Sequence, residues 1–573
     1  MAETDQQYWW QEDIFGLDHA PRPEGFTTGD GDEYDVIVVG AGMAGLSTAV
    51  LTHDGGASVL VLEAGEVGGT TYKSGAGIWI PNNSLMRALG VFDDREWCLS
   101  YMVRVAHPDH FDPHAERYGA SEWEWEKITT YYDNAADAID ALLDAGALDL
   151  TFFPSFTPDY PAMLSYHSEL DMTVQGFYRH LMPRRPDGRL GIGPELVGQL
   201  GDAVRRRDIH LRVGHRVTGV IQDHGGAVVG VTADTAAGAV SLYARQGVVF
   251  ATGGFPHNAE IIRDHWRGPL YSSCAVPTAQ GDFVKIGLEV GAELAHMRNG
   301  WLYEDLLEKA APDRVAMEGG INVPPGDSMI YVNSEGRRVV NEKLIYQERA
   351  ETFWQRDAAG GYPNRVLFMV YDSFVANDKR PWLFLETFQQ PKPWIIEGAT
   401  LEELAAKVQE RLDSLESLIG PMSLAPDFAA ELARTIERFN GFARAGKDED
   451  FGRGGIMTQH DWNGPGRPGN EANRTMHPFA DQGPYYCTLI CGMVLDTNGG
   501  PKTNASSQVL RADGSVIEGL YGAGNCVASV AGAGYFSGGS TLGPAATFAY
   551  LASRAVAEEP VRDLSIVRGT TTA

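Results

Sequence analysis

Apolar and polar residues follow two repeating patterns along the chain, and together they predict an α/β protein. The run EYDVIVVGAG has the short apolar core of a buried strand and breaks at Gly40, and the residues after it have a helical pattern. ASVLVLEAG predicts a second strand that ends at Glu63, and RQGVVFATGGF predicts a third that ends at Ala251. Alternating strands and helices of this kind are typical of a parallel sheet that is covered by helices.

Helical patterns are more frequent after residue 275. TAQGDFVKIGLEVGAELAHM predicts a helix that ends at a glycine, and LEELAAKVQERLDSLESLI and FAAELARTIERFNGFARAG predict amphipathic helices. VPPGDSMIYVNSEGRRVVNEKLIY predicts a strand, a turn and a second strand. DWNGPGRPGNEANRTMHPFADQGP is rich in Gly, Pro and Asn and predicts a loop, whose place in the chain suits a lid or a crossover.

Length, composition and charge narrow the class of protein. A chain of 573 residues favours two domains, and no apolar stretch approaches the length of a bilayer-spanning helix. The first thirty residues lack the features of a secretory signal, so we expect a cytoplasmic protein. A net charge of −30 disfavours nucleic acid as a partner. The five scattered cysteines, including the lone pair Cys487 and Cys491, indicate buried thiols and neither a disulfide framework nor a metal site.

The glycines after the first strand predict a dinucleotide site. Gly40, Gly42 and Gly45 have the GxGxxG spacing, which lets backbone amides and a helix N-terminus approach a pyrophosphate. Glu63 lies at the end of the next strand, where an acid binds a ribose hydroxyl. An acid at this position favours FAD or NAD over NADP.

Small residues elsewhere in the chain favour FAD over NAD. EVGGTTYKSGAGIW forms a small-residue loop that could lie against a flat ring system, and ATGG and GLYGAGN occur at the ends of two later predicted strands. With GAGMAG and GGSTLGPAATFAYLA, these segments resemble the signatures of the fumarate reductase and succinate dehydrogenase flavoprotein superfamily, over residues 34 to about 556.

The resemblance implies FAD and a set of residues that hold it. In that superfamily the final helix points its N-terminus at the flavin edge where negative charge gathers on reduction. No histidine occupies the loop where succinate dehydrogenases attach flavin, so the FAD is expected to be non-covalent. The implied FAD-binding residues are Gly40, Gly42, Ala44, Gly45, Glu63, Gly69, Thr70, Thr71, Ser74, Gly75, Gly77, Val217, Ala251, Thr252, Gly253, Gly524, Asn525, Thr541 and Leu542.

The resemblance also implies a Rossmann-like, discontinuous FAD-binding domain, with an inserted α+β domain that caps the substrate and carries catalytic groups. The expected parts are an acidic arm at 1–33, the first FAD-binding part at 34–275, the capping domain at 276–483, the second FAD-binding part at 484–560 and a tail at 561–573.

The segment NEKLIYQERAE carries the candidate catalytic residue, Tyr346. In soluble fumarate reductases, a segment similar to VNSEGRRVVNE is followed by a proton-donating arginine, and the pattern places Tyr346 at that position. The 3-ketosteroid Δ1-dehydrogenases and related cyclohexanone dehydrogenases have a tyrosine there, which removes the proton next to the ketone. Their ketone-binding tyrosine corresponds to Tyr486 in GPYYCTLI, with Tyr485 as the alternative.

A tyrosine base needs help, because a free phenol has a pKa near 10. The site is therefore expected to lower the pKa of Tyr346, and a further tyrosine, Tyr132 or its neighbour Tyr131, is expected to assist it. The chain departs from the steroid enzymes in reading GMVLDT where they have GDLGT, and YFSGGSTLGP where they have YPGPGATIGP. These differences put a steroid substrate in question but leave the predicted reaction type unchanged.

Three functions follow from these patterns. The first is desaturation of a small apolar cyclic ketone, a 3-oxosteroid or a cyclohexanone, with electrons passed to a quinone or another acceptor. The second is reduction of an activated double bond by the same groups, and the third is a non-catalytic flavin electron carrier. An apolar substrate would allow a loose association with a membrane surface, although no basic amphipathic helix supports one. The sequence leaves the oligomeric state open.

Overall fold

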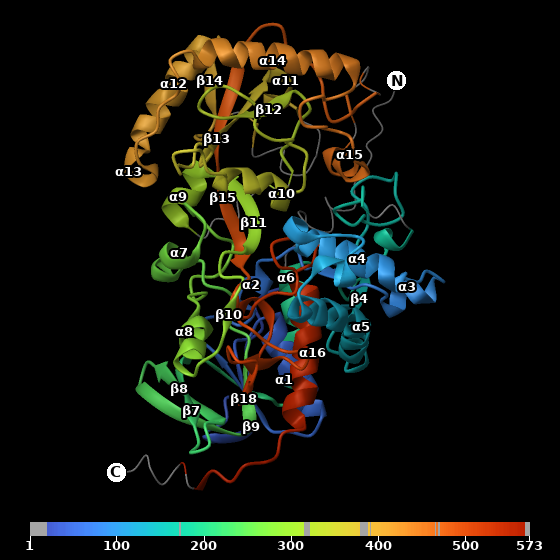
Figure 1. Ribbon diagram of the computed structural model, residues 1–573, viewed down its shortest axis with the longest axis vertical. Helices are drawn as coiled ribbons and strands as arrows, with labels where there is room; N and C mark the ends of the chain where they lie inside the picture. Colours follow the sequence, from blue (N-terminus) through green and yellow to red (C-terminus); the bar gives the residue numbers. More distant parts are fainter. Residues whose placement is uncertain are drawn as a thin grey trace.

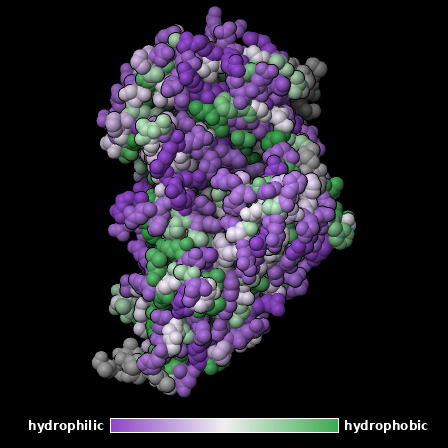
Figure 2. All heavy atoms as spheres, in the orientation of Figure 1, coloured by the Kyte–Doolittle hydropathy of each residue, from purple (hydrophilic) through white to green (hydrophobic). Residues whose placement is uncertain are grey.

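The computed structural model describes residues 20–170, 174–314, 321, 323–378, 388–389, 391–464, 466–467, 470, 472–565 and 567. Most of the predicted acidic arm, residues 1–19, lies outside the described residues. The chain forms two large sheets, one toward each end of the long axis, and their helices pack around them (Figure 1). Among the described residues, no helix is both long and apolar enough to cross a membrane. The face shown in Figure 2 is covered mainly by polar residues, with apolar residues in small separate groups.

The first sheet confirms the predicted α/β architecture. Its strand order is β17-β18-β9-β1-β2-β6, with β8 paired to β9 and β7 to β8. β1 runs parallel to β2 and to β9, so that Val38 lies opposite Val61 on one side and Val249 on the other. The strands are β1 (Glu33–Val39), β2 (Val59–Glu63), β6 (His210–Val213), β7 (Arg216–Gln222), β8 (Val228–Thr235), β9 (Gly238–Phe250), β17 (Gln508–Leu510) and β18 (Val516–Gly522).

Both faces of this sheet are buried, which explains why β1 and β2 read as continuous apolar runs. Val36 and Val38 belong to a core shared with the helices α1, α5, α6 and α16, whereas Ile37 and Val39 belong to a core shared with β7–β9. These helices are α1 (Met43–Asp54), α5 (Glu122–Asp144), α6 (Gly193–Arg206) and α16 (Leu542–Ala557).

The second sheet is antiparallel and forms the centre of the inserted region. Its order is β11-β15-β13-β12, and β14 pairs with β15. α12 (Leu401–Ser414) and α14 (Phe428–Ala445) pack against it, as their amphipathic patterns predict (Figure 1). The strands are β11 (Gly300–Leu306), β12 (Met329–Val332), β13 (Val366–Asp372), β14 (Ile396–Gly398) and β15 (Tyr485–Thr497).

The domain boundary predicted at 483/484 falls before a strand of this second sheet. β15 pairs along its length with β11 and β13, and the chain returns to the first sheet only at β17. The remaining elements are β3 (Ile78–Trp79), β4 (Leu150–Phe152), β5 (His180–Pro183), β10 (Leu294–Ala295), β16 (Gly500–Pro501), α2 (Gly69–Tyr72), α3 (Ser84–Ala88), α4 (Arg95–Ala106), α7 (Ala259–His265), α8 (Asp282–Glu289), α9 (Leu307–Asp313), α10 (Tyr346–Ala350), α11 (Ser373–Ala376), α13 (Glu416–Ile419) and α15 (Met457–Asn463). All five cysteines are free and buried, as predicted.

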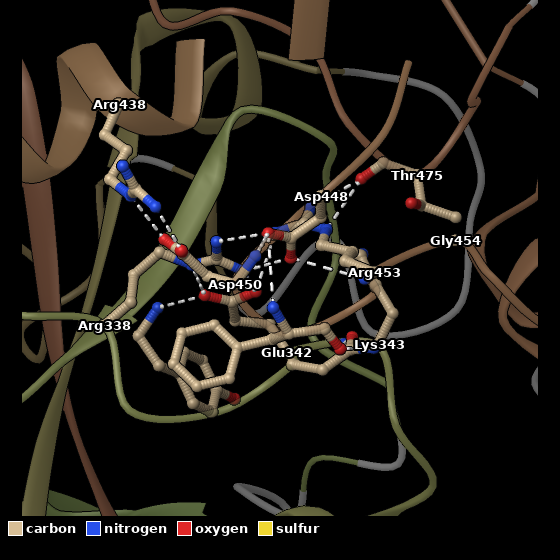
Figure 3. Close-up of polar contacts among 12 residues, drawn as sticks. Arg338, Glu342, Lys343, Arg438, Asp448, Asp450, Arg453, Gly454 and Thr475 are labelled. Carbon is tan, nitrogen blue, oxygen red and sulfur yellow. Dashed lines mark hydrogen bonds and ion pairs between the residues drawn. The ribbon is translucent and has the colours of Figure 1, made fainter. Parts of the chain in front are cut away.

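The second strand predicted within VNSEGRRVVNEKLIY does not form. After β12 the chain makes a single bridge, Val332 with Arg338, and then runs irregularly to α10. Arg338, Glu342 and Lys343 turn inward, whereas Glu335 and Arg337 stay exposed. Arg338 forms ion pairs with Glu342 at 2.8 Å and with Asp448 at 2.9 Å, and Arg453 contacts Glu342 at 3.1 Å (Figure 3).

This ion network is largely buried, with Arg338 its most exposed member, and it lies just before Tyr346 in the chain. Arg453 also donates to the carbonyl of Met329 at 2.7 Å, and Lys343 Nζ donates to the carbonyl of Gly326 at 2.7 Å. Burial alone would raise the pKa of Glu342, but the charges of Arg338 and Arg453 lower it below its usual value. Glu342 is therefore ionised, and removing its charge would leave a buried arginine uncompensated.

We expect the substitution E342Q to destabilise the fold by about 3–5 kcal/mol, because breaking a buried ion pair leaves one partner desolvated and unpaired. Chemical denaturation of the purified protein measures this effect. The matched control is D450N, which breaks the more exposed pair of Asp450 with Arg438 and should cost at most about 1 kcal/mol.

The same network implies a dependence of stability on pH. Because the pKa of Glu342 is lowered in the folded state, its contribution is present above the ordinary glutamate pKa and is lost as the pH falls through the lower folded value. E342Q should therefore lose less stability than wild type on acidification. Equal losses in the two proteins would contradict this account of the network.

Candidate active site

One cavity of about 430 Å³ lies where the carboxyl ends of the parallel strands meet the second sheet. Val39, Leu62 and Ala251 line it from the ends of β1, β2 and β9, while Trp301 and Leu495 line it from β11 and β15. Ligands of open α/β sheets bind at this edge of the sheet. The cavity therefore combines a nucleotide site with walls from the inserted region.

Glu63 has the position expected of a ribose-binding acid. Its carboxylate lines the cavity and accepts hydrogen bonds from the backbone N–H groups of Ala41, at 2.8 Å, and Gly65, at 2.7 Å. Burial raises the pKa of Glu63, although these two donors oppose the shift. The backbone thus fixes the carboxylate at the cavity wall.

The glycines of GAGMAG have different roles in this geometry. A Cβ on Gly45 would lie 1.9 Å from the carbonyl oxygen of Gly40, and one on Gly40 would lie 2.3 Å from that of Ala251, so both allow α1 and the strands to pack closely. Gly42 borders the cavity, and a Cβ there would meet its nearest neighbour, the hydroxyl of Thr71, only at 3.4 Å. Gly45 alone among the predicted FAD-binding residues does not line the cavity.

The other predicted FAD-binding residues all lie in the wall of this one cavity. Segments from both ends of the chain supply them, which fits a long cofactor. They are Gly40, Gly42, Ala44, Glu63, Gly69, Thr70, Thr71, Ser74, Gly75, Gly77, Val217, Ala251, Thr252, Gly253, Gly524, Asn525, Thr541 and Leu542.

The N-terminus of α16 opens into the same cavity. Thr541 is its N-cap residue and makes no side-chain capping hydrogen bond, and Leu542 and Ala545 of the first turn line the wall. The positive end of the helix dipole therefore faces the cavity, which favours an anionic group there. The N–H groups at the start of α16 and the acceptor carboxylate of Glu63 together fit FAD.

Tyr346 lies at the apolar end of the cavity and belongs to a cluster of three tyrosines. Its hydroxyl is 3.1 Å from that of Tyr166, and its ring meets Tyr535 edge-on with the centroids 5.4 Å apart. Tyr166 and Tyr535 stack at 5.8 Å. All three line the cavity, although they come from segments far apart in the chain. Sequence reasoning did not find Tyr166 or Tyr535, although Tyr535 directly begins the quoted YFSGGSTLGP segment.

The three phenols differ in how well the protein supports their ionised forms. Burial raises the pKa of Tyr346 well above its usual value, and Tyr166 and Tyr535 raise it further, in contrast to the lowered pKa expected from the sequence. Burial also raises the pKa of Tyr535, but hydrogen bonds from Tyr346, the backbone N–H of Gly539 and Thr541 oppose the shift. These hydrogen bonds suit Tyr535 to donate a hydrogen bond to a developing anion.

The other two tyrosines predicted as catalytic lie elsewhere. Tyr486 is in β15 opposite Tyr371, and their rings stack at 5.7 Å in the core of the second sheet. Tyr132 is in α5 beneath the guanidinium of Arg95. Neither lines the cavity, and the alternative Tyr131 donates its hydroxyl to the carbonyl of Trp79. Their predicted roles are not supported by these positions.

Residues of α10 tie Tyr346 to three other segments. The side chain of Gln347 accepts from the N–H of Leu302 in β11, at 2.7 Å, and donates to the carbonyl of Ala533, at 3.0 Å, two residues before Tyr535. Glu348 faces the partly buried imidazole of His167 at 3.2 Å, next to Tyr166. Burial would lower the pKa of His167, but Glu348 and Glu169 raise it to about 10, so this contact is an ion pair at neutral pH. α10 thus sets the relative positions of all three tyrosines.

The walls around the tyrosine cluster are apolar and aromatic. No arginine is among the described residues that line the cavity, and its basic side chains, Lys73 and His215, belong to segments that also border the nucleotide end. The rings of Trp301, Tyr303 and Trp462 contact the cluster, and the other apolar residues that line the cavity include Phe153, Phe156, Met163 and Leu495. This end suits a neutral apolar ligand better than a dicarboxylate.

Comparison with known proteins agrees with this site. The family model described as an FAD binding domain matches residues 35–542. The chain is 28% identical to the 3-oxosteroid 1-dehydrogenase of Mycobacterium tuberculosis, over 92% of this chain and 99% of that protein. It is 30% identical to the 4-oxocyclohexanecarboxylate 2-dehydrogenase of Sinomonas cyclohexanicum, over 91% of this chain and 93% of that protein.

Solved structures show the same fold. The 3-ketosteroid Δ1-dehydrogenase of Sterolibacterium denitrificans, in complex with 1,4-androstadiene-3,17-dione, has a TM-score of 0.77 at 24% identity and covers 92% of this chain and all of that one. A flavocytochrome c3 fumarate reductase has a TM-score of 0.62 at 22% identity, over 97% of this chain and 84% of that one. The chain therefore belongs to the FAD-binding-domain family, in the ketosteroid and cyclohexanone dehydrogenase branch of the fumarate reductase and succinate dehydrogenase superfamily, and is an FAD-dependent oxidoreductase.

Proposed function

We propose that the protein desaturates a neutral cyclic ketone, a 3-oxosteroid or a smaller cyclohexanone-type compound, next to its carbonyl group. The observation that carries this proposal is the tyrosine cluster: Tyr346 and Tyr535 both line the apolar end of the cavity whose other end fits FAD. The activities of the relatives support the ketone, because both are named for rings that bear one, whereas the neutral charge rests on the absence of an arginine among the described residues that line the cavity.

The two tyrosines have complementary tasks in this reaction. Tyr535 donates a hydrogen bond to the ketone oxygen, which stabilises the enolate that forms as the neighbouring C–H bond breaks. Tyr346 accepts that proton as a phenolate, and Tyr166, whose hydroxyl lies 3.1 Å away and can act as donor or acceptor, donates a hydrogen bond to the phenolate once it has formed. The residues at the other end of the cavity would hold FAD without a covalent link, and the flavin would supply the acceptor for the hydride of the next carbon. The electrons then pass to a quinone or another acceptor.

The raised pKa of Tyr346 also supports a second direction of the same chemistry. A protonated phenol is a proton donor, so with reduced FAD the site would saturate an enone and Tyr346 would supply the proton. Reduction of a dicarboxylate is disfavoured because no arginine lines the described cavity.

Anaerobic titration of the oxidised protein with 4-androstene-3,17-dione and with cyclohexanone tests the proposal, with the flavin absorbance as the readout. Bleaching by either ketone supports desaturation and identifies the size of the substrate. If neither bleaches the flavin, but an enone reoxidises the dithionite-reduced protein, the enzyme is a reductase. No response in either direction would contradict both functions.

The substitution Y346F should lower the rate of flavin bleaching by about 10²- to 10⁴-fold, the usual contribution of a general base. Phenylalanine keeps the ring and its contacts, so the FAD content and the thermal midpoint should stay near those of wild type. The control is Y486F, which removes a hydroxyl outside the cavity and should leave the rate unchanged. If Y486F slowed bleaching and Y346F did not, the role that the sequence assigned to Tyr486 would be restored.

The rate of flavin bleaching should rise with pH across the neutral range. Below the pKa of a phenol, the ionised fraction increases about tenfold per pH unit, and the pKa of Tyr346 is raised well above its usual value. Stopped-flow measurement at several pH values gives this profile. Reduction of an enone needs the protonated phenol and should be flat over the same range. A bleaching rate that is independent of pH in wild type would argue against Tyr346 as the base.

A further inference from the structure

Two histidines and a glutamate converge outside the cavity, where α4 ends and α5 begins. His107 is the C-cap residue of α4, His110 ends the short 3₁₀ turn that follows, and Glu124 is in the first turn of α5. The ligand atoms of the three side chains all lie within 4.8 Å of one another. None of the three residues lines the active-site cavity, so the function proposed above does not use them.

The local backbone brings these side chains together. Residues three apart in a 3₁₀ turn lie on the same side, and the rings of His107 and His110 accordingly stack with their centroids 5.2 Å apart. Glu124 is oriented by a capping box, in which its carboxylate accepts from the N–H of Ser121 at 2.8 Å. His107 is buried, Glu124 is half-buried and His110 is exposed, so the group is buried on one side and open to solvent on the other.

The separations between these groups suit a shared metal ion. His107 Nδ1 is 3.3 Å from Glu124 Oε1, and His110 Nε2 is 3.6 Å from Glu124 Oε2. Both are longer than the charge-assisted hydrogen bonds of about 2.7–2.9 Å that an ordinary ion pair makes. Ligands about 2.0–2.1 Å from a tetrahedral zinc ion are separated from one another by about 3.3–3.4 Å, close to these values.

The ligand types narrow the choice of metal. Two imidazoles and one carboxylate are the protein ligands of many zinc sites with an open fourth position, whereas Ca²⁺ and Mg²⁺ prefer oxygen alone. We propose that His107, His110 and Glu124 bind Zn²⁺ or another divalent transition metal, with water in the fourth position. The capping box of Glu124 is the kind of outer contact that orients a metal ligand.

The site lies against the loop that leads to Tyr535. A Cβ on Gly532 would be 2.8 Å from Cε1 of His107, and the N–H of Ala533 donates to the carbonyl of Ala106 at 3.0 Å. Gly532 and Ala533 precede Tyr535 by three and two residues. A metal bound here therefore braces the segment that positions a tyrosine of the active site, without contacting the substrate.

Titration of the metal-free, tag-free holoprotein with Co²⁺ tests the site, because tetrahedral Co²⁺ has visible absorption beyond the flavin band. We expect this absorption to saturate at about one Co²⁺ per chain and to disappear when Zn²⁺ is added in competition. H110A and E124Q should abolish it. Glutamine keeps the helix cap at position 124, and His110 is exposed, so both variants should fold and retain FAD.

H114A is the matched control, because it removes an exposed histidine four residues away that is not part of the group. It should bind Co²⁺ as wild type does. The proposal is overturned if wild type shows no saturable band, or if the band persists undiminished in H110A and E124Q. It is also overturned if H114A loses the band to the same extent as H110A.

Discussion

The buried charge of Glu342 is the constraint on which the active site depends. Two arginines, Arg338 and Arg453, surround it, and their other partners are the backbone of β12 and the loop that carries Asp448. With these side chains pointing inward, the chain after β12 forms no further strand and runs irregularly to α10, which begins at Tyr346 and places it at the cavity. A rigid support of this kind suits a proton-transferring group, whose effect depends on close positioning.

The cavity is divided according to the chemistry of its two ends. Backbone N–H groups, Glu63 and the N-terminus of α16 form the end that fits FAD, and aromatic side chains form the other. α10 holds the aromatic end together because Gln347 binds the backbone next to Tyr535 while Tyr346 contacts Tyr166. Under the proposed function, the neutral phenol of Tyr346 stands where the soluble fumarate reductases have an arginine, and it suits a ketone better than an anion.

Much of the nucleotide site could be predicted from the sequence because its determinants are local. The GxGxxG turn, the acid at the end of β2 and the start of α16 each belong to one short segment, and each lies at the cavity. The tyrosine cluster is different, since Tyr166 and Tyr346 are 180 residues apart and no periodicity relates them. Tyr486 has a plausible motif, but β15 pairs with β13 and directs that side chain onto Tyr371. Likewise, the contact of Arg453 with Glu342 spans 111 residues, and the pattern around it predicted a strand.

A crystal structure of the enzyme with FAD and 1,4-androstadiene-3,17-dione or 2-cyclohexenone would test the account most directly. We expect the ketone oxygen to lie within hydrogen-bond distance of Tyr535 Oη and Tyr346 Oη to lie against the carbon next to the carbonyl group. A ketone bound away from both hydroxyls, or held by Tyr486, would contradict it.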